Sequence, residues 1–171
     1  MKKFDDILKG GDLRSIGRSN VVVSLINNQK SFDQLFKQLF HPDRKVVMRT
    51  ADAIEKITQT NPAYLKQHKY NILQLCHKAI NIELKWHLAL LISRIPLSKK
   101  EVSEVWKLLT TWAKDKEESK IVRVNSIQGL FNLLAEHIEL QQDFDLTIGE
   151  IEKDNIPSIN ARLKKLKHAR R

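Results

Sequence analysis

KIVRVNSIQGLFNLL, residues 120–134, carries an arginine at its fourth position, followed by apolar residues at the spacing of one helix face. Related stretches recur along the chain, each with a cation in a similar place, at residues 46–57, 82–95, 120–134 and 158–167. These cations, separated by 36, 38 and 39 residues, are Arg49, Lys85, Arg123 and Arg162. A period of this length has room for two helices and is typical of helical-repeat proteins, whose units complete their cores against their neighbours. We therefore predict an all-α fold, a right-handed α-solenoid of about four helical hairpins.

Local signals divide the chain into hairpins within one predicted domain, residues 1–171. We predict an N-terminal cap of short helices at 1–30, repeats at 31–61, 62–96 and 97–137, and a C-terminal cap repeat with a basic tail at 138–171. Ser31 with Gln34 and Ser98 with Glu101 have capping-box spacing, and Asp43 is a predicted N-cap. Pro157 suits the first position of the last helix. In the cap, Gly17 is expected to break a short helix that begins after Asp12.

The net charge of +10 is unevenly distributed along the chain. Residues 1–123 carry a net +10, residues 124–155 a net −6 and residues 156–171 a net +6. Two basic regions that flank an acidic one suit an anionic or mixed-charge partner. The alternative is that these charges only solvate the outer faces of the solenoid, and the sequence leaves both interpretations open.

Cysteine content and hydropathy favour a cytoplasmic location. Cys76 is the only cysteine, so no intrachain disulfide can form, and its apolar helix predicts a small buried hydrophobe rather than a nucleophile. The first residues place two aspartates where a secretory signal would need an apolar stretch. Apolar runs such as 88–92 are far shorter than the roughly 20 residues of a membrane span. We expect no membrane span.

Several stretches together resemble a group of small bacterial HEAT-repeat proteins of unestablished activity. They are LRSIGRSNVVV, MRTADAIEKI, KQHKYNIL, KWHLALL and SKIVRVNSIQGL, and the resemblance runs from about residue 10 to 166. It implies a stack of HEAT-like helix pairs and implies no reaction. HEAT-repeat DNA glycosylases use a tryptophan–aspartate signature that this chain lacks. Its tryptophans Trp86, Trp106 and Trp112 have the spacing of core residues, so we do not expect that activity.

Catalytic and metal-binding patterns are missing from the sequence. The six histidines form no pair at metal-ligand spacing, and His87 is the one we expect to be enclosed. The glycines around Gly10 and Gly17 lack the Gly-Lys-Ser/Thr ending of a phosphate loop. We therefore predict no enzyme activity, no cofactor and no metal.

The second helix of each hairpin is expected to line the concave side of the solenoid and to supply the candidate binding residues. These are Arg49, Asp52, Lys56, Lys85, Arg123, Asn125, Gln128 and Arg162. For Arg49 and Arg123 we favour the alternative that each guanidinium bonds to an acidic turn residue of a neighbouring repeat and holds the stack together.

A basic rim and tail form a second set of candidates: Arg14, Arg18, Lys164, Lys165, Lys167, Arg170 and Arg171. The tail could bind an anionic partner as an amphipathic basic helix, or it could be a solvated end.

The function that this sequence favours is a non-catalytic scaffold that binds a protein partner on its concave face. The alternative is sequence-independent nucleic-acid binding through the basic surface and tail. Whether the acidic 124–155 segment folds against the basic tail stays open.

Overall fold

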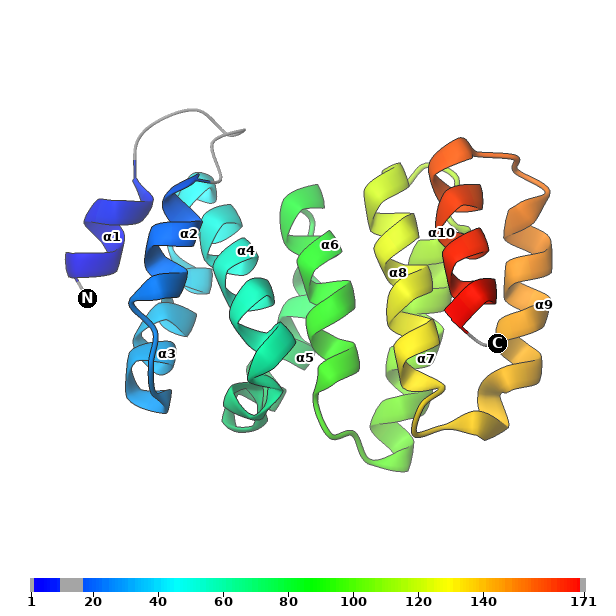
Figure 1. Ribbon diagram of the computed structural model, residues 1–171, viewed down its shortest axis with the longest axis horizontal. Coiled ribbons are helices and arrows are strands. Elements are labelled where there is room, and N and C mark those ends of the chain that lie inside the picture. Colours follow the sequence, from blue (N-terminus) through cyan, green and yellow to red (C-terminus); the bar gives the residue numbers. More distant parts are fainter. Residues whose placement is uncertain (1, 10–16, 170–171) are drawn as a thin grey trace. The chain divides into compact units, whose positions relative to one another are not determined.

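The computed structural model describes residues 2–9 and 17–169, and these residues contain ten α-helices and four short 3-10 segments, joined by turns, and no strand (Figure 1). The all-α prediction is therefore confirmed. The chain divides into two compact units, Met1–His87 and Leu88–Arg171. The boundary falls inside one continuous helix, α6 (Ile82–Leu91).

The first unit contains α1 (Lys2–Leu8), α2 (Gly17–Ser24), α3 (Gln29–Phe36), η1 (Lys37–Phe40), α4 (Arg44–Thr60), η2 (Pro62–His68), α5 (Lys69–Lys78) and the first part of α6. The long helix α4 is its centre, because α1, α2, α3, η1 and η2 all pack against it. The buried face of α4 follows helical spacing, from Val46 through Ala53 and Ile54 to Ile57.

Two polar contacts tie successive segments of this unit together. The His68 ring stacks on Phe36 with 3.9 Å between ring centroids, and its Nε2 lies 2.8 Å from an Asp33 carboxylate oxygen. Arg44 forms a two-pronged ion pair with Glu83, with its Nη2 2.8 Å from each carboxylate oxygen. These contacts fix η2 to α3 and the start of α6 to the start of α4.

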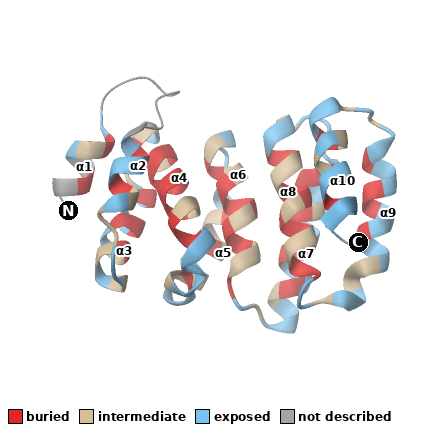
Figure 2. Ribbon diagram, viewed as in Figure 1, coloured by how far each residue is buried: buried red, intermediate tan, exposed pale blue. Residues whose placement is uncertain are grey.

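The second unit contains the end of α6, η3 (Ile92–Arg94), α7 (Lys99–Lys114), α8 (Lys120–Leu133), η4 (Ile138–Leu140), α9 (Gln141–Glu152) and α10 (Pro157–Ala169). Helix α8 packs against α7, α9, α10 and η3. Buried residues consequently occur on more than one side of it (Figure 2). The second helices α8 and α10 pack side by side, and so do the first helices α7 and α9 (Figure 1).

Most predicted helix ends are confirmed. The side chain of Asp43 caps α4, Ser98 and Glu101 form the capping box of α7, and Pro157 is the first residue of α10. The prediction for Ser31 was wrong. Asn28 caps α3, and Ser31 is the third residue of that helix, where its hydroxyl accepts from the Asn28 backbone N–H at 3.3 Å.

Gly17 is the first residue of α2. The short helix expected between Asp12 and Gly17 lies outside the described residues. His87 is buried at 7% exposure, as expected, and Cys76 is buried too. Burial raises the pKa of the Cys76 thiol, so this group stays protonated.

None of the described helices combines the length and apolarity that crossing a membrane requires. Within residues 2–9 and 17–169, no group of three or more histidine, cysteine, aspartate or glutamate side chains is arranged to hold a metal ion.

Candidate interaction surface

The repeated cations fall into different environments, although they occupy similar places in the sequence. Arg49 is 0% exposed and Arg123 is 2% exposed, whereas Lys85 and Arg162 are half-buried. A fully enclosed guanidinium cannot contact a partner, so Arg49 and Arg123 do not belong to a binding face. This corrects the candidate set.

Both buried arginines bond to the end of another helix in their own unit. Arg49 donates from Nη1 to the carbonyl of Leu8, at the end of α1. Arg123 donates from Nε to the carbonyl of Ala113 at 2.9 Å, and its Nη2 pairs with the Asp154 carboxylate in the turn between α9 and α10. Arg123 thus has the acidic turn partner that the alternative expects, whereas Arg49 donates to a carbonyl at a helix C-terminus, a group that lacks a partner within its own helix.

Asp154 is held as a carboxylate by two cations. The hydrogen bond from Arg123 and then that from Lys116, whose Nζ lies 2.9 Å away, lower the pKa of Asp154 below its ordinary value. A carboxylate whose folded pKa is lowered stabilises the fold above its unfolded pKa of about 3.9. That contribution is lost as the pH falls through the folded pKa.

We therefore expect Asp154→Asn to cost stability at pH 5–7 and to cost progressively less as the pH falls below about 4. Urea unfolding across this pH range measures the difference between the wild type and the variant. Glu136→Gln is the matched control, because it removes an exposed carboxylate from the same unit. A difference that stays constant down to pH 2 would contradict the assignment.

Asp52 and Lys56 form a closed polar cluster with α2. The Lys56 Nζ lies 2.6 Å from Asp52 and 2.8 Å from the side-chain oxygen of Asn20, and the Ser19 hydroxyl donates to Asp52. The cluster joins α2 to α4 and leaves Asp52 buried. Its contacts are internal to the first unit, so Asp52 contributes to packing there.

In the second unit, four side chains form a continuous row of hydrogen bonds across η3, α8 and α10. Arg162 donates to Gln128 Oε1 at 2.6 Å, and Gln128 Nε2 donates to Asn132 Oδ1 at 2.8 Å. Asn132 Nδ2 then donates to the Ser93 hydroxyl at 3.1 Å. We call Ser93, Asn132, Gln128 and Arg162 the polar row. All four are half-buried, as is Asn125 one helical turn before Gln128.

Arg162, at one end of the row, has no carboxylate within ion-pair distance among the described residues. Burial alone lowers its pKa from the ordinary value, and an arginine stays charged in either case. Its planar fork has five N–H donors, and the row uses one of them. This guanidinium is therefore partly desolvated and has unused donors.

Two members of the polar row, Ser93 and Asn132, were not among the residues expected from the sequence. Ser93 follows an apolar run and reads as part of a core helix. One signal was present: Asn132 lies 39 residues after Ser93, close to the repeat interval, so the two occupy similar places in successive second helices.

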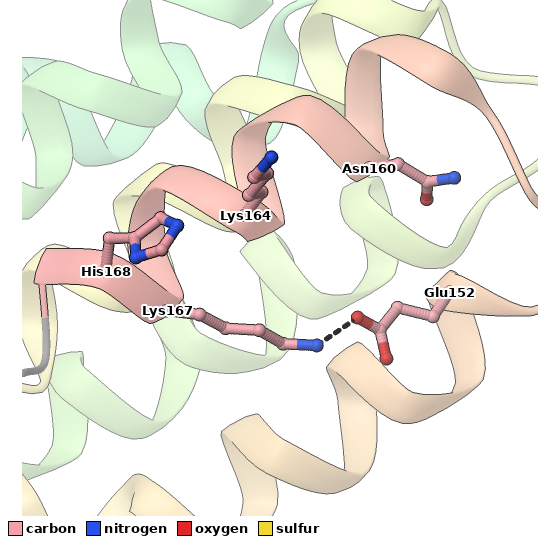
Figure 3. Close-up of a pocket in the computed structure, with 5 residues that line it drawn as sticks. All are labelled: Glu152, Asn160, Lys164, Lys167 and His168. Atoms are coloured by element: carbon pink, nitrogen blue, oxygen red, sulfur yellow. Dashed lines mark hydrogen bonds and ion pairs between the residues drawn. The ribbon is translucent and has the colours of Figure 1, made fainter.

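The basic tail lies against the end of the acidic segment. Figure 3 shows Lys167 of α10 directed at Glu152 of α9, and the two form an ion pair. With Lys164 and His168 they line a cavity of about 340 Å³ (Figure 3). Lys164 and Lys165 are exposed, and neither forms an ion pair with another described residue. The acidic segment thus neutralises part of the tail.

The remaining basic candidates are placed only in part. Arg18 is exposed, and its guanidinium donates to the carbonyl of Lys9. Arg14, Arg170 and Arg171 lie outside the described residues.

A family model described as a HEAT repeat domain matches residues 12–169, which is most of the chain. No curated protein and no solved structure matches it.

Proposed function

This chain belongs to the HEAT repeat family. We propose that it is a non-catalytic scaffold that binds an extended segment of a partner protein on the face formed by η3, α8 and α10. The observation that carries the proposal is the polar row, which ends in the half-buried Arg162. We also propose the cytoplasm as its location, because the buried Cys76 is the only cysteine.

The polar row supplies the groups that recognise a peptide backbone. A side-chain amide has two N–H donors and two acceptor positions. Gln128 uses one donor and one acceptor within the row, and so does Asn132. The second N–H and the second lone pair of each remain for the N–H and C=O of a bound chain.

The dimensions of the row suit a short extended segment. The row crosses three neighbouring helical segments, η3, α8 and α10. Packed helices lie about 8–10 Å apart, so the row spans about 20 Å. An extended chain rises about 3.3 Å per residue, and about six residues would cover that distance.

The chemistry of this face supports binding rather than catalysis. The groups in the row are two amides, a hydroxyl and a guanidinium. None of them ionises near neutral pH, so none is suited to proton transfer there.

We expect Arg162→Gln to reduce partner binding about tenfold, because arginines are frequent hot spots and tenfold corresponds to about 1.4 kcal/mol. The measurement is affinity capture from a native lysate with tagged wild type and variant, each with and without nuclease. Lys164→Gln is the matched control, since it removes an exposed cation from the same helix. The melting temperature of Arg162→Gln should stay close to that of the wild type, because no carboxylate loses a partner.

Failure to capture any protein that depends on Arg162 would count against this function. Sequence-independent nucleic-acid binding is the second candidate, supported by the exposed Lys164 and Lys165. Capture that nuclease abolishes, together with a steep loss of affinity as salt rises, would favour this alternative.

A further inference from the structure

A second surface of the second unit has the form of a binding groove. It runs between α7 and the η4–α9 segment and consists of two cavities of about 610 and 400 Å³. Both cavities are lined by Trp106 and Lys107, so they adjoin along α7. Their lining extends from Lys99 to Asp115, which corresponds to about 24 Å of helix at 1.5 Å per residue. We call this the outer groove.

The two sides of the outer groove carry opposite charges. Along α7, one side carries Lys99, Lys107 and Lys114, with Asp115 at its end. The facing side carries Glu139 and Asp143, on η4 and α9, beside His137. The Trp106 indole N–H donates to Asp143, and Lys114 pairs with Glu150. These two polar contacts join α7 to α9. Lys107 forms no ion pair with the rest of the described chain and is exposed.

The outer groove also presents apolar surface. The Trp106 ring, Val102 and Leu140 line it. The Thr110 hydroxyl lines the larger cavity and is buried without a hydrogen-bond partner among the described residues. A buried hydroxyl without a partner costs free energy, and a group bound in the groove could supply the missing hydrogen bond.

We propose that the outer groove binds an amphipathic helix of a partner protein, one with acidic residues along one edge of its apolar stripe and basic residues along the other. The groove length matches about 16 helical residues. Lys99, Lys107 and Lys114 are separated by eight and seven residues, about 12 and 10.5 Å. Residues two turns apart on a bound helix have the same spacing and lie on one edge.

Charge and shape exclude the other occupants. A nucleic acid would place phosphates against the acidic side of the groove. A second copy of this chain would present the same hollow surface, and two hollows do not fill each other. A helix with an apolar stripe and two oppositely charged edges would pack its stripe on the apolar residues of the groove and pair its edges with the charged residues on both sides. The proposal concerns a different face from the polar row and stands independently of it.

The test is calorimetric titration of the full chain with designed 16-residue peptides. The matched peptide has leucines at i, i+3, i+4 and i+7 spacing, with glutamates along one edge and lysines along the other. Two comparison peptides replace the leucines by serine or place lysine on both edges. We expect the matched peptide to bind at least tenfold more tightly than either.

Variants of the protein locate the binding site. We expect Lys99→Glu with Lys107→Glu to weaken the matched peptide about tenfold, because two attractions become repulsions. Lys100→Glu is the control, an exposed lysine of the same helix that does not line the groove. The indole N–H resonance of Trp106, identified with Trp106→Phe, should shift on binding. Thr110→Val should weaken any peptide that hydrogen-bonds there and leave the fold intact.

Absence of binding by the matched peptide would overturn the proposal, and so would binding that the double lysine variant leaves unchanged. Sedimentation of the protein alone adds an independent outcome. A dimer that the double variant dissociates would place a second copy in the groove and would also overturn it.

Discussion

Arg123→Met is expected to lower the free energy of unfolding by about 2 kcal/mol, the scale observed when a buried polar group loses its hydrogen-bond partner. The substitution leaves the Ala113 carbonyl without its donor and Asp154 without its nearest cation. Methionine fills much of the same space, so the loss reports on the bonds rather than on a large cavity. Guanidinium chloride unfolding gives the magnitude.

The effect of Arg123→Met should be local to the second unit. Arg123 joins α8 to the end of α7 and to the turn before α10. Hydrogen exchange should therefore accelerate first in α9 and α10, and the first unit should keep its protection. A uniform acceleration over the whole chain would argue against this local role.

Arg162→Met provides the control at a similar place in the repeat. Arg162 bonds to the neutral Gln128 and has no carboxylate partner among the described residues. Its replacement should cost less than about 1 kcal/mol, the net value of an ordinary hydrogen bond. If Arg123→Met and Arg162→Met lowered the free energy of unfolding equally, the proposal that Arg123 holds the fold together while Arg162 binds a partner would be contradicted.

The fold could be predicted because its signals are local. Asp43, Ser98 and Pro157 each act within one helical turn, and an apolar stripe is visible in a single helix. Ser31 shows where this reasoning fails. Two overlapping capping boxes compete there, one starting at Asn28 and one at Ser31, and the structure uses the earlier one.

The candidate site could be predicted only in part, because burial is a tertiary property. Arg123 and Arg162 occupy similar places in their repeats, yet only Arg123 is enclosed. The difference comes from Asp154, which lies 31 residues later in a turn. The outer groove has no sequence signal, since its two sides come from helices of different hairpins.

Gly129→Ala and Gly149→Ala are expected to change stability in opposite directions, although both replace a helical glycine by the best helix former. On propensity alone, each would stabilise its helix by about 0.5–1 kcal/mol. A Cβ on Gly149 meets nothing within 4 Å, so α9 should gain about this amount. A Cβ on Gly129 would overlap the backbone carbonyl oxygen of Ala89 and approach Leu109 Cδ1 to 3.1 Å.

Because Ala89 presents backbone rather than a flexible side chain, α8 itself must move away to accept the methyl group of Gly129→Ala. Overpacking of this kind costs about 1–3 kcal/mol, more than the helix propensity returns. We expect a net loss of about 1 kcal/mol for Gly129→Ala, measured by the same chemical unfolding as for Gly149→Ala. Stabilisation by both substitutions would mean that α8 and Ala89 are not in contact. The close packing of the last repeats against the end of α6 would then be wrong.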